Sequence, residues 1–160
     1  MLTLLTHPKD MERLRNTPAL MDSALEELLR YESPLQRATR LALEDIHIDN
    51  ICIPKGDRIF IILGAANRDP EMFAQPNVVN LERDPNPHLA FGFGRHFCSG
   101  AALSRLEGKI GIETLLRRLP GIHLKATQQE WHNSFMLRGL RSLPVSFWPT
   151  GAWASALAPE

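Results

Sequence analysis

One stretch of ten residues, Phe91–Gly100 (FGFGRHFCSG), has residue types and spacing that indicate specific chemistry. It sets the thiol of Cys98 in a glycine-shaped loop just before a helix with apolar periodicity. Gly92 and Gly94 permit backbone angles that are closed to other residues, so the loop can turn tightly. Backbone amides freed by the turn, and the positive end of the following helix, stabilise a negative sulfur. The segment therefore resembles the setting of a metal-ligating thiolate.

The residues around Cys98 fit the same interpretation. Gly100 leaves no side chain where the following helix would press against a flat ligand. Phe91 and Phe97 would keep water away from the sulfur, and His96 can present a ring N–H to an anionic group. A flat, metal-containing ligand with an anionic edge group would suit this loop.

Other interpretations of the cysteines remain open. A single Cys at the start of a helix is most often a small buried hydrophobic residue. Zinc needs about four ligands, often as two close pairs, whereas only His96 and Cys98 are close here, with His88 more distant. A nucleophilic Cys needs a partner base, which a single sequence cannot locate. We interpret Cys52, in the apolar stretch 51–53, as structural.

The loop resembles the haem-binding loop of the cytochrome P450 family, whose pattern is F-G-x-G-x-H/R-x-C-x-G. All five fixed residue types are present, and His96 occupies the basic position. Family members are haem-thiolate monooxygenases, so the resemblance implies haem b as the cofactor and Cys98 as the axial ligand of its iron. It also implies that Phe91, Gly92, His96 and Gly100 belong to the haem-binding site.

A buried triad is also implied by the resemblance. Glu27 and Arg30 match the family's E-x-x-R helix, although such a pair by itself is common and usually solvated. Arg83 falls where the family places the Arg that completes the triad. One carboxylate bound by two guanidinium groups would fix the irregular segment 74–97 by hydrogen bonds rather than by packing. The neighbouring Glu26 is expected to be dispensable.

Two further segments resemble parts of the family that line the pocket. Within 34–45, the match implies that Arg40 pairs with a haem propionate. The same match puts four residues on the substrate side: Leu35, Gln36, Arg37 and Ala38. Segment 134–144 resembles the C-terminal hairpin, with Met136 and Leu137 at the pocket positions. An exposed strand face is the alternative for both arginines, and ordinary core is the alternative for the two hairpin residues.

The elements that must position these residues predict a mainly α fold with small β-sheets, in the α+β class. A helix begins with Thr17 as N-cap and Pro18 in its first turn, and it ends before Ser33. A long helix over 99–119 should pack behind the Cys98 loop. Shorter elements are expected at five places: a buried strand over 58–63, a helical piece over 65–70, and strands near 122–124, 134–137 and 145–148.

The resemblance implies the C-terminal half of the cytochrome P450 fold. We expect residues 1–149 to form a partial haem-binding domain and residues 150–160 to form a disordered tail. The segment 2–8 is similar to the end of the family's long distal helix, so that helix, its acid–alcohol pair and the N-terminal helices are expected to be missing. A truncated or split gene, or an N-terminal half on another chain, would account for the short length.

Composition narrows the class of partner. Lys plus Arg equals Asp plus Glu at 18 each, so nothing indicates nucleic acid or another polyanion. A run of about 18 apolar residues and a signal-peptide pattern are both missing, so we expect neither membrane anchoring nor export. Two cysteines provide no disulfide framework and favour a reducing compartment, so we expect a cytoplasmic protein.

Three functions are consistent with these features. The favoured one is a C-terminal fragment or split part of a P450 monooxygenase, which inserts one oxygen atom of O2 into a small organic substrate. Its electrons would come from a ferredoxin or a flavoprotein. The alternatives are a non-catalytic haem-binding or haem-sensing module and a cofactor-free interaction protein. Whether this chain alone is an enzyme stays open, because the distal oxygen-activating helix is missing.

Overall fold

A computed structural model describes residues 1–125 and 128–148 of the chain. Its helical elements are α1 (Leu2–Thr6), α2 (Pro8–Asn16), η1 (Pro18–Leu20), α3 (Met21–Tyr31), α4 (Leu63–Ala66), η2 (Gly94–His96) and α5 (Ala101–Arg118). Its strands are β1 (Ala38–Leu41), β2 (Ile46–Ile48), β3 (Ile51–Ile53), β4 (Arg58–Ile61), β5 (His123–Leu124) and β6 (Val145–Ser146). Helix outweighs sheet in these ranges, which confirms the predicted mainly α fold with small β-sheets.

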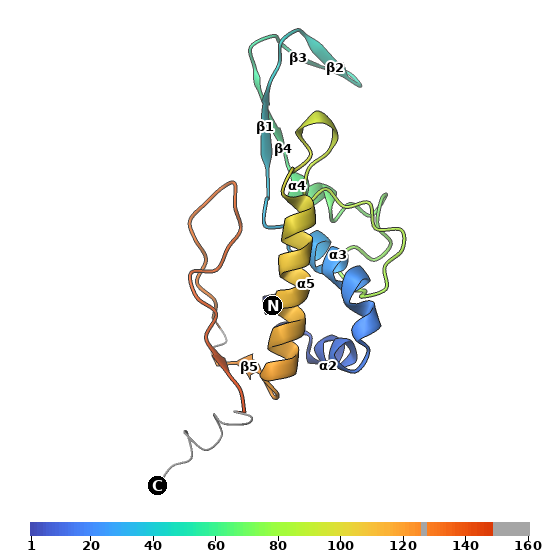
Figure 1. The fold of residues 1–160 in the computed structure, drawn as a ribbon. Helices are drawn as coiled ribbons and strands as arrows, with labels where there is room; N and C mark the ends of the chain where they lie inside the picture. The colour runs from blue at the N-terminus through green and yellow to red at the C-terminus, as the bar shows by residue number, and fades with distance from the viewer. Residues whose placement is uncertain (126–127, 149–160) are drawn as a thin grey trace.

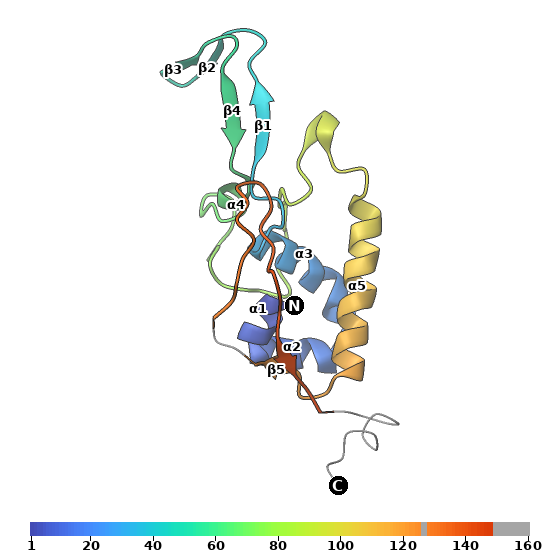
Figure 2. The same ribbon diagram turned by 90° about the vertical axis from the view of Figure 1, so that its left-hand side faces the viewer.

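The strands form three separate two-stranded antiparallel sheets: β1 with β4, β2 with β3, and β5 with β6. In the first, Ala38 lies opposite Ile61 and Arg40 lies opposite Ile59. Figure 1 and Figure 2 show this ribbon and the loop before α5 projecting from the same end of the helical body. That end therefore carries both segments to which the sequence assigns haem contacts.

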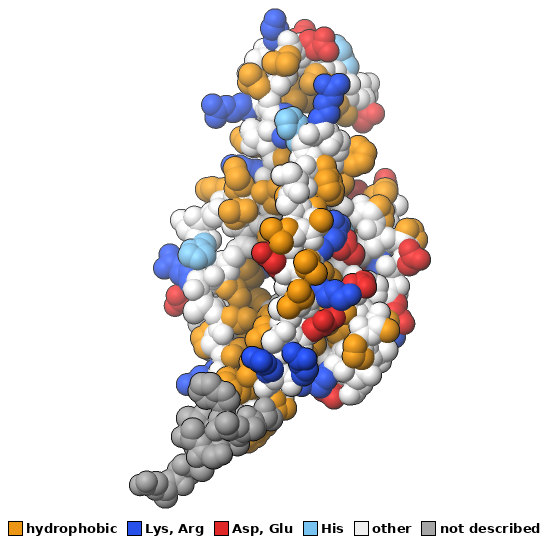
Figure 3. Space-filling view, viewed as in Figure 1, with side chains coloured by type: hydrophobic (Ala, Val, Ile, Leu, Met, Phe, Trp, Pro, Cys, Tyr) orange, Lys and Arg blue, Asp and Glu red, His pale blue; other side chains and the backbone are white. Residues whose placement is uncertain are grey.

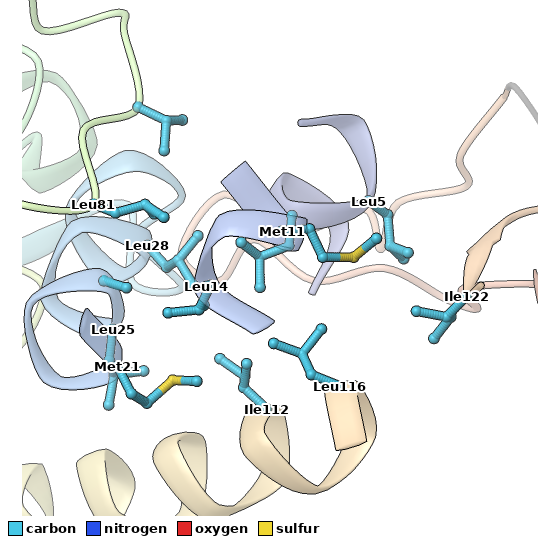
Figure 4. Packing of buried hydrophobic residues seen from close by; sticks show 13 residues of the cluster. Leu5, Met11, Leu14, Met21, Leu25, Leu28, Leu81, Ile112, Leu116 and Ile122 are labelled. Atoms are coloured by element: carbon cyan, nitrogen blue, oxygen red, sulfur yellow. The ribbon is translucent and has the colours of Figure 1, made fainter. Parts of the chain in front are cut away.

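The hydrophobic core lies between α3, α5 and the short helices α1 and α2. Met21, Leu25 and Leu28 recur at helical spacing on α3 and belong to the same buried cluster as Ile112 and Leu116 of α5, which Figure 4 shows. Each such side chain, when fully buried, contributes about 1.5–3 kcal/mol to folding. Apolar side chains on one face of each helix thus hold α3 against α5.

A glycine brings α3 and α5 into close contact. A Cβ built on Gly108 would lie 3.0 Å from Cδ1 of Leu25, so any larger residue at this point of α5 would press on α3. The close approach matters for the site, because α3 and α5 supply the charged side chains that bind the irregular segment between them.

Helix α5 also carries apolar side chains on its outer side. Leu103, Leu106 and Ile110 are 59%, 54% and 54% exposed. Figure 3 shows hydrophobic side chains on the surface over this helix. A helix with apolar side chains on both sides is usually buried on both sides by other parts of a protein. Within the described residues, only the inner side of α5 is covered.

Three predicted elements agree closely with the structure. The long helix predicted over 99–119 is α5, with bounds Ala101–Arg118. The helix predicted after Thr17 is α3, and its proline-initiated first turn is the short 3₁₀ helix η1. Of the stretch 74–97 that was predicted to be irregular, residues 74–93 contain no helix or strand, and Gly94–His96 form the short 3₁₀ helix η2. Periodicity and the position of proline were sufficient for these elements.

The prediction of a buried strand over 58–63 was wrong about burial. Strand β4 exists, but Phe60 and Ile61 are exposed, because no other element in the described ranges covers the β1–β4 ribbon. Cys52 is likewise exposed on β3 opposite His47, so it does not belong to the core. A short apolar run fits a strand, but it does not tell whether anything packs on that strand.

The smaller predicted elements shift or shrink. The helical piece expected over 65–70 is α4, which begins at Leu63. The strand expected over 134–137 is reduced to a single bridge between Leu137 and Leu35. The tail expected to be disordered, 150–160, lies outside the described residues. None of the helices in the described ranges is long and apolar enough to cross a membrane.

Candidate functional site

The Cys98 loop is closed by backbone hydrogen bonds. Cys98 N–H donates to the carbonyl of Phe91 at 2.9 Å, and Phe97 N–H donates to the carbonyl of Gly94 at 3.0 Å. Gly92 and Gly94 have φ angles of 75° and 70°, which are strained for residues with a side chain. The two glycines therefore allow the chain to fold back on itself and present Cys98 at a fixed point.

The thiol of Cys98 is free and exposed just before helix α5. Gly100 is the N-cap of that helix, and Ala101 N–H donates to the Cys98 carbonyl at 3.2 Å. A Cβ built on Gly100 would lie 3.8 Å from the Cys98 sulfur, so glycine keeps this side of the thiol open. An open thiol beside a side-chain-free position would allow a flat, iron-containing group to be held by Cys98.

The aromatic residues of the loop do not cover the sulfur. The rings of Phe91 and Phe97 have centroids 6.3 Å apart, but Phe97 is 51% exposed and Cys98 is exposed as well. Shielding of the thiol, which we expected from these two rings, is therefore not provided by the described residues. His96 is also exposed, at the end of η2.

A buried carboxylate lies behind the loop. Glu27 of α3 is 0% exposed and accepts two hydrogen bonds from Arg30, at 2.7 and 2.8 Å. Arg83 Nε donates to the same carboxylate at 3.0 Å, and so does the Asn80 N–H at 2.9 Å. Burial raises the pKa of Glu27, but these hydrogen bonds outweigh burial and leave the pKa below its ordinary value. Glu27 is therefore held as a carboxylate.

The two arginines that bind Glu27 also bind backbone carbonyls, both in the irregular segment and at Asn67, just after α4. Arg30 Nη1 donates to the carbonyls of Asn67 at 2.8 Å and Pro76 at 2.9 Å. Arg83 Nη1 donates to the carbonyl of Ala74 at 2.8 Å. The guanidinium groups thus supply hydrogen bonds that regular secondary structure would otherwise provide.

A second cluster of charged side chains joins α3 to α5. Arg105 donates to both oxygens of Glu26, at 2.7 and 2.8 Å, and His88 Nε2 lies 3.0 Å from the same carboxylate. The hydrogen bond from Arg105 holds the pKa of Glu26 below its ordinary value, and burial lowers the pKa of His88. Glu26, which the sequence suggested to be dispensable, is therefore a carboxylate held by Arg105 and His88.

Comparison with known proteins identifies the family of this chain. The family model described as cytochrome P450 matches residues 4–140. The chain belongs to the cytochrome P450 family. Since the match includes both the Cys98 loop and α3, it covers every residue to which the sequence assigned a role in the haem-binding site.

Individual relatives give the extent of the match. The biotin biosynthesis cytochrome P450 of Bacillus subtilis (strain 168) is 47% identical over 146 residues, which cover 91% of this chain and 37% of the relative. The polyketide biosynthesis cytochrome P450 PksS of the same organism is 49% identical over 148 residues, which cover 91% and 36%. The chain thus spans little more than a third of the length of these relatives.

Solved structures also match over most of this chain. P450BioI, crystallised in complex with hexadec-9Z-enoic acid ligated acyl carrier protein, has a TM-score of 0.89 at 47% identity and is covered over 38% of its length. CalO2 has a TM-score of 0.90 at 37% identity and is likewise covered over 38%. The fold of this chain is therefore part of the P450 fold.

The remaining predicted P450 site residues lie along β1 and the segment before it. Arg40 is exposed, and its guanidinium donates to the Thr39 carbonyl at 2.9 Å. Arg37 lies against the rings of Phe60 and Phe135, with its Cζ 4.5 and 5.9 Å from their centroids. Since neighbouring residues of an extended chain alternate in direction, Arg37 and Arg40 leave opposite faces of the ribbon.

The structure brings together the two segments that the P450 resemblance assigned to the substrate side. Leu35 forms a bridge with Leu137, and Gln36 N–H donates to the Met136 carbonyl at 2.8 Å. The Gln36 side chain turns back to donate to the carbonyl of Ser33 at 2.5 Å. Ala38 begins β1. Both the backbone N–H and the side-chain amide of Gln36 therefore donate hydrogen bonds to backbone carbonyls of this chain.

Glu26, His88 and Arg105 form a cluster next to the Cys98 loop that sequence reasoning missed. Glu26 is separated from His88 by 62 positions and from Arg105 by 79, so no periodic pattern relates them. A signal was present in the pair Glu26–Glu27, because adjacent positions on a helix face different directions and so meet different partners.

Other possible sites show no link to the loop. The described ranges contain no group of three or more His, Cys, Asp or Glu residues placed to hold a metal ion. A hollow of about 620 Å³ lies between α2 and the C-terminal part of α5, and none of the predicted site residues lines it.

Proposed function

We propose that this chain is the haem-binding part of a cytochrome P450 monooxygenase, with Cys98 as the axial thiolate ligand of haem b. The observation that carries the proposal is the exposed Cys98 thiol at the start of α5, beside Gly100 and in a loop of the P450 pattern. Bound haem supplies the chemistry by which one oxygen atom of O2 enters an organic substrate.

The residues of this chain have separate tasks in that proposal. Cys98 would hold the iron through its thiolate, and His96 and Arg40 would offer N–H donors to the propionate groups. Phe91, Gly92 and Gly100 shape the loop so that a flat group can approach the sulfur. The Glu27 triad keeps the irregular segment that leads to the loop in one conformation.

The substrate side is proposed to include the run of residues before and at the start of β1, together with the hairpin that pairs with it. These are Leu35, Gln36, Arg37, Ala38, Met136 and Leu137. The relatives named for biotin and polyketide biosynthesis, and the one crystallised with a fatty-acyl carrier protein, favour an acyl or polyketide-type substrate. Electrons would come from a ferredoxin or a flavoprotein.

Monooxygenase activity is proposed for this chain together with the remainder of the P450 fold. The match covers 37% of the biotin biosynthesis relative, so most of that relative's length has no counterpart here. The exposed apolar side chains of α5 offer a surface on which further helices of the fold would pack. A chain without those helices should couple electron consumption to product formation poorly, because timed proton delivery and a closed pocket are needed.

Haem titration of single-cysteine variants tests the proposal. The parent chain, reconstituted with haem, reduced and exposed to carbon monoxide, should show the strongly red-shifted Soret band of thiolate ligation. Cys98→Ala should lose this band, whereas Cys52→Ala should keep it, because Cys52 lies exposed on the separate β2–β3 hairpin. An unchanged spectrum in Cys98→Ala would overturn the assignment.

A further inference from the structure

Three segments far apart in the sequence meet at the carboxylate of Glu26. Arg105 of α5 donates from Nε and Nη2 to its two oxygens at 2.7 and 2.8 Å, in a bidentate arrangement. His88, whose side chain is 3% exposed, places Nε2 3.0 Å from the same carboxylate. The cluster therefore ties α3 and α5 to the segment just before the Cys98 loop.

The ring of His88 is fixed through both of its nitrogen atoms. Ala90 N–H donates to Nδ1 at 3.2 Å, so Nδ1 must carry a lone pair. The hydrogen of the neutral ring is then on Nε2, where it donates to Glu26. Rotation of the ring would break one of these bonds, so His88 fixes the backbone at Ala90 relative to Glu26.

The cluster also contacts the first residue of the loop. The Arg105 guanidinium lies over the ring of Phe91, with Cζ 4.5 Å from the ring centroid, and the His88 ring centroid lies 6.3 Å from that of Phe91. The carbonyl of Phe91 accepts the N–H of Cys98 at 2.9 Å. Only one residue, Phe91, thus stands between the cluster and the backbone of Cys98.

We propose that Glu26, His88 and Arg105 form a positioning network that holds Phe91 and, through its carbonyl, fixes the backbone of Cys98. The network sets the direction in which the Cys98 thiol points. Its members are positioning residues, because they act on Cys98 only through Phe91. The consequence for haem rests on the proposed function, whereas the effect on the loop backbone does not.

An ion pair on the same two helices provides a matched control. Lys109 of α5 donates to Asp22 of α3 at 2.7 Å, one turn along from Arg105, and this pair is exposed. It joins the same helices without contacting the loop. If the Glu26 cluster only held α3 to α5, removing the Asp22–Lys109 pair should have the same effect as removing the cluster. If the cluster positions Cys98, removing this pair should leave the loop unchanged.

Hydrogen exchange of segment 91–98 in the chain without haem tests the proposal. Arg105→Lys keeps the charge but loses the planar fork and the stacking on Phe91. His88→Asn keeps an acceptor oxygen near Ala90, but its shorter side chain cannot at the same time place an N–H donor where Nε2 meets Glu26. In both variants the Cys98 amide should exchange about tenfold faster than in the parent, while amides of α3 are unchanged. Lys109→Ala should behave as the parent does.

A spectroscopic measurement separates positioning from general stability. At a temperature where circular dichroism of all variants matches the parent, Arg105→Lys reconstituted with haem should show a smaller fraction of thiolate-type carbonyl complex. Parent-like exchange at Cys98 in both loop-directed variants would overturn the network, and so would faster exchange spread equally over α3 and α5. If Cys98→Ala kept the parent haem spectrum, the proposed function would fail, while a local exchange response would still support the network.

Discussion

Arg83 Nε donates a hydrogen bond to Glu27 Oε2 at 3.0 Å across 56 positions of sequence. Both side chains are almost fully buried, at 8% and 0% exposure, and Arg30 binds the same carboxylate from within the helix. One side chain of α3 therefore fixes a distant segment that has no helix or strand of its own.

Replacing Glu27 by Ala should strongly destabilise the chain. The change leaves two guanidinium groups without their shared carboxylate in a buried site, which costs on the order of 3–5 kcal/mol. The measurement is the free energy of unfolding in urea. Asp22→Ala on the same helix is the control, because its ion pair with Lys109 is exposed to solvent and contributes little to stability. If both variants lost the same free energy of unfolding, the buried position of Glu27 would add nothing to its contribution.

Stability should fall in acid partly because of Glu27. Its pKa is lowered in the folded chain, so its contribution is complete above the pKa of the unfolded chain, about 4.3, and is lost as the pH falls through the folded value. Glu27→Gln lacks this titration. The difference in unfolding free energy between parent and Glu27→Gln should therefore be largest at neutral pH and shrink below about pH 4. A constant difference from pH 7 to pH 3 would contradict the argument.

Arg83→Lys should loosen the irregular segment although it keeps the positive charge. Arg83 binds Glu27 with Nε and the carbonyls of Ala74 and Val78 with its terminal nitrogens, at 2.8 and 3.2 Å. The planar guanidinium group reaches all three acceptors at once, whereas the compact ammonium of a lysine cannot. The Asn80 amide, which donates to Glu27, should then exchange faster with solvent. Parent-like protection in Arg83→Lys would mean that charge alone is sufficient.

Gly64→Ala should destabilise the chain when residue 36 is Gln and stabilise it when residue 36 is Ala. A Cβ on Gly64 would overlap the Gln36 carboxamide, which is held by its bond to Ser33. Gly64→Ala alone should therefore destabilise the chain by about 1 kcal/mol. With Gln36→Ala the overlap is gone, and alanine is favoured over glycine in a helix by roughly 0.5–1 kcal/mol. Thermal unfolding of the four chains measures this coupling, and additive effects would contradict it.

Much of the fold could be predicted because it depends on local spacing. The apolar period of α3, the pairing of Glu27 with Arg30 three positions on, and the glycines before Cys98 are all visible within one short window. Arg83 could be assigned only through the family resemblance. Glu26, His88 and Arg105 could not be found in this way, because their contacts depend on how closely α5 packs on α3. The exposure of β4 was missed since a strand's sequence does not reveal what covers it.

The outer row of Leu103, Leu106 and Ile110 on α5 has a consequence for handling the protein in solution. The chain has a formal net charge of +0 at pH 7, so charge repulsion between molecules is weak where these side chains are exposed. Solubility should consequently pass through a minimum near neutral pH, and self-association should increase with protein concentration. Because acid also titrates Glu27, a mildly alkaline buffer of low ionic strength is the better condition for limiting self-association of this chain.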